Sequence, residues 1–257
     1  MTPRPHDHDA GGDHGLLAAK AALRDEVWGR LEDAGVARFP GARNRISNFV
    51  GAEQAAERLR DTTAWQAART VKANPDSPQW PVRQRALEDG KTLYMAVPRL
   101  AQADPFFLLD PDHLADSPRR ASSIRGASAS AVTVAIDDVD PVDLVVTGCV
   151  AVSRDGTRLG KGGGFSDLEF AVASEAGLVG AGTIVATTVH PLQVLPAGAI
   201  PRTDHDVAVD LIVTPEDVIE VTRPTDRPAG RLVWTELTDD KIASIPLLQQ
   251  LRARRGT

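Results

Sequence analysis

The residues with the clearest chemical signature form a glycine-rich stretch, GKGGGFSD, at positions 160–167. Successive glycine amides can form a concave anion site, and the backbone N–H groups at a helix N-terminus also attract negative charge. The stretch therefore predicts a loop that a phosphate-bearing ligand approaches so closely that a Cβ atom would be in the way. The alternative is a flexible turn without a ligand. The loop residues are Gly160, Lys161, Gly162, Gly163 and Gly164.

The segments around this loop predict alternating strands and helices. Alternation of this kind indicates an α/β fold with a mostly parallel sheet, in which ligands bind beyond the carboxyl ends of the strands. The loop follows one expected strand and precedes one expected helix, so it belongs at that edge. Residues 110–131 predict a polar, irregular surface insertion. The expected strands are 70–72, 92–97, 106–109, 144–150, 183–188 and 207–213, and the expected helices are 16–34, 52–60, 82–89 and 165–176.

Length and composition indicate an ordinary globular chain with 257 residues, of which 42% are apolar and 25% charged. The net charge of −6 argues against a nucleic-acid or acidic-membrane partner. The single cysteine, Cys149, lies in an apolar run, which predicts an inert core thiol and a reducing, cytoplasmic setting. We expect residues 1–15 to be a disordered tail and not a secretory signal, 16–222 to form the domain, and 223–257 to be a C-terminal extension.

Three separated segments share features with one enzyme family. They are the strand and glycine loop at 143–164, the segment 200–214 with His205 and Asp206 before a strand, and the basic pair Lys20 and Arg24. Together they resemble the 5-formyltetrahydrofolate cyclo-ligases (methenyltetrahydrofolate synthetases) over about residues 16–222. Residues 44–100 are similar to a divergent branch, the methenyltetrahydrofolate synthetase domain-containing proteins.

The resemblance implies a three-layer α/β/α sandwich related to the ribose-5-phosphate isomerase and coenzyme A transferase group. It also implies ATP, Mg²⁺ and a small-molecule substrate: the formamide oxygen of 5-formyltetrahydrofolate is phosphorylated, N10 attacks the activated carbon, and phosphate leaves. The implied ATP-binding residues are Lys20, Arg24, Gly160, Gly162, Gly163 and Gly164; Arg158 and Lys161 are implied as catalytic, Asp167 and Asp206 as metal ligands, and Phe165 and Ser166 as substrate contacts.

This chain departs from the family pattern after the glycines. The family usually has two tyrosines, an aspartate and an arginine there, whereas this chain has Phe165, Ser166, Asp167 and Leu168. No match to the family's substrate-binding glutamate segment is found in residues 120–135. Two other functions therefore stay open: an ATP-dependent ligase or cyclodehydratase for another amide or carboxylate, and a non-catalytic nucleotide- or folate-binding regulator. The sequence does not specify the oligomeric state.

Overall fold

A large, mostly parallel sheet forms the centre of the protein, in a computed structural model that describes residues 10–203, 206–222 and 232–255. The strand order is β11-β10-β8-β5-β1-β2-β3-β4. The five strands from β10 to β2 are parallel, and β11, β3 and β4 join antiparallel at the two edges. The predicted α/β fold is therefore confirmed. The strands are β1 (Thr70–Ala73), β2 (Thr92–Ala96), β3 (Phe106–Leu109), β4 (Val132–Val134), β5 (Leu144–Val146), β8 (Ile184–Thr188), β10 (Leu211–Val213) and β11 (Val218–Glu220).

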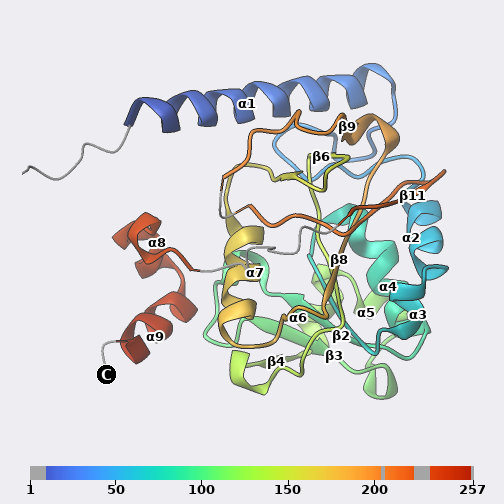
Figure 1. Cartoon of the computed structure of the whole chain (residues 1–257). Coiled ribbons are helices and arrows are strands. Elements are labelled where there is room, and N and C mark those ends of the chain that lie inside the picture. The colour runs from blue at the N-terminus through green and yellow to red at the C-terminus, as the bar shows by residue number, and fades with distance from the viewer. Residues whose placement is uncertain (1–9, 204–205, 223–231, 256–257) are drawn as a thin grey trace, which may run out of the picture.

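Side chains on the central strands alternate between two apolar layers, as the period of a strand requires. Val71 and Ala73 of β1 pack toward one layer of helices, while Val145 of β5 packs toward the other. This arrangement gives three layers (Figure 1). One face carries α2 (Ala52–Arg60), α3 (Thr63–Ala67), α4 (Trp80–Glu88), α5 (Pro118–Ala121) and α6 (Ile124–Ser130); the other carries α7 (Phe165–Glu175), α8 (Asp239–Ser244) and α9 (Pro246–Arg255).

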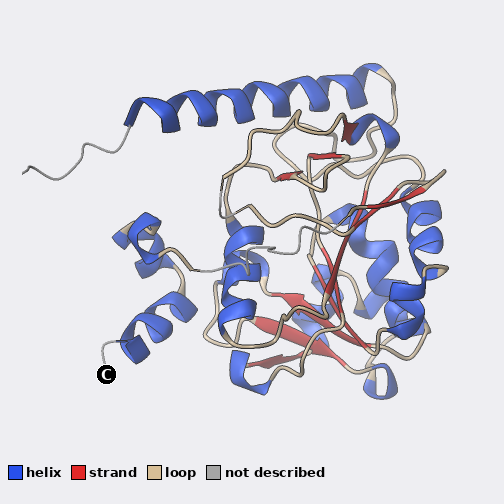
Figure 2. Cartoon of the chain, viewed as in Figure 1, coloured by secondary structure: helices blue, strands red, loops and turns tan. Residues whose placement is uncertain are grey.

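A second, three-stranded sheet supports the long first helix, α1 (Ala10–Asp33) (Figure 2). This sheet consists of β6 (Ala151–Ser153), β7 (Arg158–Leu159) and β9 (Val194–Leu195). Val27, Trp28 and Leu31 of α1 pack into the apolar cluster that this sheet shares. The helix begins at Ala10, so residues 10–15 are helical where a disordered tail was expected, because adding residues to a helix that is already packed costs little.

Two other sequence-based expectations are corrected. The expected strand 144–150 leaves the main sheet after Val146, and the chain forms β6 of the second sheet from Ala151. Gly148 lies between the two strands, where a Cβ would come within 2.8 Å of both Gln79 Oε1 and Ile46 Cγ2. The expected irregular insertion at 110–131 contains α5 and α6, whose Ala121 and Ala127 are buried against the sheet.

The expected C-terminal extension contains helices that pack onto the body. The structure describes residues 232–255 of it, and these include α8 and α9. Ile242, Ile245, Leu247 and Leu248 are buried in the same apolar cluster as α7. The few apolar residues of this segment are therefore enough to pack it onto the body, although the position of the domain boundary near 222 stays a prediction.

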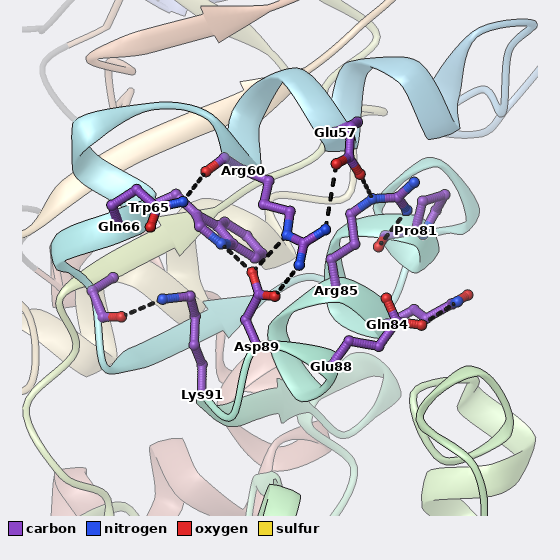
Figure 3. A network of polar contacts seen from close by, with 11 residues as sticks. Glu57, Arg60, Trp65, Gln66, Pro81, Gln84, Arg85, Glu88, Asp89 and Lys91 are labelled. Atoms are coloured by element: carbon purple, nitrogen blue, oxygen red, sulfur yellow. Dashed lines mark hydrogen bonds and ion pairs between the residues drawn. The ribbon is translucent and has the colours of Figure 1, made fainter.

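A polar network joins the helices of the opposite face, away from α7 (Figure 3). Asp89 accepts hydrogen bonds from Arg60 and from Trp65 Nε1, the latter at 2.8 Å, and Glu57 pairs with Arg85. These contacts link α2, α3 and α4, so their role is structural. Within the described residues, no helix has the length and apolar character needed to cross a membrane.

Candidate functional site

The glycine loop runs from β7 to the N-terminus of α7. Gly162 and Gly164 have φ angles of 104° and 65°, which side-chain-bearing residues adopt only with strain. A Cβ at Gly163 would lie 3.1 Å from the Phe165 ring. The glycines are therefore required by the backbone conformation of the loop and by the close approach of Phe165. These requirements exist in addition to the predicted approach of a ligand.

Helix α1 carries the two basic side chains of the predicted pair, one of which contacts this loop. Arg24 Nε donates to Gly160 O at 2.7 Å, and Lys20 Nζ donates to Asp206 Oδ2 at 2.7 Å. The two side chains are four residues apart and so share one face of the helix. Burial lowers the pKa of Arg24, and Asp206 acts in the opposite direction. The segment before β10, which carries Asp206, is thus tied to the glycine loop through α1.

Arg158 lies beneath the loop instead of facing the solvent. Its side chain is 2% exposed, Nη1 donates to Gly148 O at 3.3 Å, and Nη2 pairs with Asp167 in the first turn of α7. Its Nε has no hydrogen-bond partner among the described residues. Arg158 therefore connects the chain that leaves β5 to the start of α7, which is the geometry of a positioning residue.

The two aspartates expected to hold Mg²⁺ pair with different bases, Asp167 with Arg158 and Asp206 with Lys20. In the part of the chain that the structure describes, no group of three or more His, Cys, Asp or Glu residues could hold a metal ion. One or two carboxylates are enough for a Mg²⁺ ion that is already bound to the phosphate oxygens of a ligand. They are too few for a metal site formed by protein ligands alone. His205 lies outside the described residues.

A cavity of about 470 Å³ opens beside the loop, beyond the carboxyl ends of β1 and β2. Phe165, Ser166 and Lys161 line it, and Lys161 Nζ donates to Asp76 Oδ1 at 3.2 Å across it. The chain continues from β1 toward β2 on one side and from β5 toward β8 on the other, so this edge is a topological switch point. Open α/β sheets bind ligands at such points.

The rim of this cavity contains backbone in an unusual conformation. Arg99 and Leu100 both have positive φ angles, 62° and 53°, although neither is glycine. Such residues cost of order 1–3 kcal/mol each and cluster at ligand sites. Their position supports the assignment of this cavity as a binding site, and nothing in the sequence around them indicated it.

Sequence reasoning also missed a buried polar cluster, of which Glu169 lines the cavity. Lys72 of β1 pairs with Glu169 of α7, and Asn74 Nδ2 donates to the second oxygen of Glu169 at 3.3 Å. The side chains of Lys72 and Glu169 are 4% and 5% exposed. The signal that could have revealed them is the lysine itself, which interrupts an otherwise apolar strand.

The C-terminal segment adds one more base to the loop. Lys241 Nζ lies 3.5 Å from Gly163 O and 5.7 Å from the centroid of the Phe165 ring. The side chain of Thr238 accepts a hydrogen bond from the Lys241 N–H and so caps α8 at the turn that carries this lysine. The structure thus places one base from α1 at Gly160 and one from α8 at Gly163.

Comparison with known proteins agrees with this architecture. Residues 15–215 match the 5-formyltetrahydrofolate cyclo-ligase family. The chain is 39% identical over 239 residues to a mouse methenyltetrahydrofolate synthase domain-containing protein and 36% identical over 239 residues to the human one. These alignments cover 92% of this chain, 64% of the mouse protein and 62% of the human protein. The chain therefore spans less than two thirds of the length of these relatives.

Two further comparisons concern proteins named for folate chemistry. An 87-residue stretch, 32% of this chain and 31% of the relative, is 38% identical to an Arabidopsis thaliana 5-formyltetrahydrofolate cyclo-ligase named as mitochondrial. The NMR structure of Aquifex aeolicus 5,10-methenyltetrahydrofolate synthetase superposes with a TM-score of 0.51 at 20% identity, covering 80% of this chain and 94% of that one; this likeness shows the fold alone. The match over residues 15–215 shows that the chain belongs to the 5-formyltetrahydrofolate cyclo-ligase family.

Proposed function

We propose that this protein is an ATP-dependent cyclo-ligase that converts 5-formyltetrahydrofolate to 5,10-methenyltetrahydrofolate. The observation that carries the proposal is the placement of a glycine loop, contacted by Arg24 and Lys241, directly beside a 470 Å³ cavity lined by Phe165, with Lys20 one helical turn from Arg24. Loop amides and ammonium or guanidinium groups suit a triphosphate. A cavity with one aromatic wall suits the folate.

The reaction needs an amide oxygen to become a leaving group. The formyl oxygen attacks the γ-phosphorus of ATP and ADP leaves. N10 then attacks the formyl carbon, a C–N bond forms, N10 loses its proton to the solvent, and the C–O bond breaks as phosphate departs. There is little covalent chemistry for the protein to perform, so its contribution is positioning and charge stabilisation. The bases on α1 would hold the phosphates, and Lys161, which lines the cavity at the loop, would face the transferred group.

Mg²⁺ belongs to the proposal as the ion that neutralises phosphate charge, with Asp167 and Asp206 as the carboxylates that would take it. Arg158 would then act on the site indirectly, by fixing Asp167. A cytoplasmic setting goes with this proposal, as the single cysteine predicts.

A second function has one specific observation in its favour. Phe165 and Ser166 line the cavity where the family pattern has two tyrosines, so two phenol hydroxyls are missing from its wall. A ligase that keeps the phosphate site but activates another amide or carboxylate would show this combination. Slow turnover of 5-formyltetrahydrofolate that rises when tyrosines replace both residues supports the first function; ATP turnover only with another acceptor supports the second.

The test is the absorbance of methenyltetrahydrofolate formed from 5-formyltetrahydrofolate, followed together with ADP release. Both products are expected in equal amounts and only with ATP present. Arg24→Met should raise the KM for ATP, whereas Arg30→Met is the matched control because Arg30 lies on the same helix and its guanidinium pairs with Glu26 on the surface. Methenyltetrahydrofolate formation without ADP release, or no formation at high protein concentration, would refute the proposal.

A further inference from the structure

The ion pair between Lys72 and Glu169 lies inside the protein, between the main sheet and α7. Lys72 stands in register with Tyr94 and Val145 on the neighbouring strands, neither of which is charged at neutral pH. Apolar side chains of similar volume can replace a buried ion pair with little loss, or with a gain, of stability. Holding the sheet against α7 therefore does not require these charges.

The carboxylate of Glu169 is held in one orientation. One oxygen pairs with Lys72 Nζ, and the other accepts from Asn74 Nδ2 at 3.3 Å. Lys72 itself is fixed from another direction, because its Nζ lies 5.9 Å from the centroid of the Phe106 ring. Each carboxylate oxygen can accept more than one hydrogen bond, so both keep acceptor capacity. Glu169 also lines the 470 Å³ cavity, and this capacity is available to a ligand there.

Phe165 completes the arrangement. It precedes Glu169 by four residues on α7, so the two side chains lie on one face of the helix, and both line the same cavity. An aromatic wall beside a fixed carboxylate suits a planar nitrogen heterocycle that carries neighbouring N–H donors. Two parallel N–H groups on such a ring match the two oxygens of a carboxylate.

We propose that Glu169 determines specificity for the substrate ring, by accepting hydrogen bonds from the amino group and ring N–H of the pterin, with Lys72 and Asn74 as positioning residues. This inference rests on the proposed function, because it assigns the folate to this cavity. It also places the ring against Phe165 and the formyl group toward the glycine loop.

The experiment uses calorimetric titration of the full chain with three ligands: 5-formyltetrahydrofolate, p-aminobenzoylglutamate, which lacks the ring, and a non-hydrolysable ATP analogue. The informative variant is K72M/E169L, since it removes both charges and leaves no buried ion unpaired. K72M/E169Q is the second variant, because it is neutral but keeps one acceptor. D89N is the matched control: it removes a partly buried carboxylate that accepts from Arg60 on the opposite face.

K72M/E169L is expected to bind 5-formyltetrahydrofolate at least roughly tenfold more weakly than wild type, with an intermediate loss in K72M/E169Q. Affinity for p-aminobenzoylglutamate and for the ATP analogue should stay within about twofold. D89N should change none of the three. Binding of 5-formyltetrahydrofolate within about threefold of wild type, in whichever double variant folds, would show that the pair is structural and would overturn the inference alone. A wild-type protein that binds the ATP analogue but no folate would instead refute the proposed function, and the ring assignment with it.

Discussion

Breaking the ion pair between Lys20 and Asp206 from its two sides should change ATP affinity in opposite directions. The two groups lie 2.7 Å apart with side chains 10% and 15% exposed. Lys20→Met removes a charge-assisted hydrogen bond to phosphate worth about 1.5–3 kcal/mol, which raises the Kd for ATP roughly 10- to 150-fold. Asp206→Asn keeps the ammonium and removes a competing negative charge, so the Kd for ATP should fall.

The free energy of unfolding distinguishes a direct effect on ATP binding from a purely structural effect of the two substitutions. Asp206 also accepts from the Thr203 N–H at 2.8 Å, so it keeps one partner in Lys20→Met. Both variants should therefore lose a similar free energy of unfolding, about 1–3 kcal/mol. The control Arg30→Met breaks an exposed pair, with side chains 42% and 54% exposed, and should cost under about 1 kcal/mol.

The assay is calorimetric titration with a non-hydrolysable ATP analogue, first with EDTA and then with Mg²⁺, alongside thermal unfolding. Without metal, the Kd for the ATP analogue should rise in Lys20→Met and fall in Asp206→Asn. Equal weakening in the two variants would refute the assignment of Lys20 to the phosphates. If Asp206 takes Mg²⁺, Asp206→Asn should lose only the part of the affinity that depends on the metal.

Three further outcomes are expected. Lys241→Met should weaken binding of the ATP analogue roughly threefold or more, because it removes the base that α8 adds to the loop, and Lys241→Arg should restore the affinity. If calorimetric titration shows the same affinity in Lys241→Met as in the wild type, Lys241 is not part of the phosphate site. Burial raises the pKa of the Cys149 thiol to about 11, so only about a thousandth is thiolate at pH 8, and a disulfide reagent should modify it in the unfolded protein but not in the native one. Burial acts to raise the pKa of Asp155, but hydrogen bonds from Ser153, Thr157 and Gly198 hold it at about 2, below its ordinary 3.8. Stability that is present above about pH 4 should therefore be lost as the pH falls toward 2, and acid unfolding of Asp155→Asn should lack this component.

The sequence predicted the elements whose signals are local. Gly35 and Gly90 end α1 and α4 with positive φ angles, as helix-stopping glycines should. The helix that follows the glycine loop begins at Phe165, as expected. The strand expected at 144–150 is split between two sheets, with Gly148 packed closely against Gln79 between the two parts, and no local pattern encodes such a tertiary contact.

The candidate site was predictable only in part, for the same physical reason. Lys20 and Arg24 could be placed near the glycines through family resemblance, but their partners Asp206 and Gly160 follow from packing of α1 on the small sheet. Glu169 is separated from Lys72 by 97 positions, and only the layered fold brings them together. Apolar residues in the C-terminal segment were too few for its packing to be apparent without the rest of the core.

The most direct test of the whole account is a crystal structure of the protein with a non-hydrolysable ATP analogue and 5-formyltetrahydrofolate. We expect the phosphates against residues 160–164 within hydrogen-bond distance of Lys20 and Arg24, and the pterin ring between Phe165 and Glu169. A nucleotide bound in the separate cavity of about 350 Å³ lined by Arg38, Trp80 and Arg119, with the glycine loop unchanged, would contradict the account.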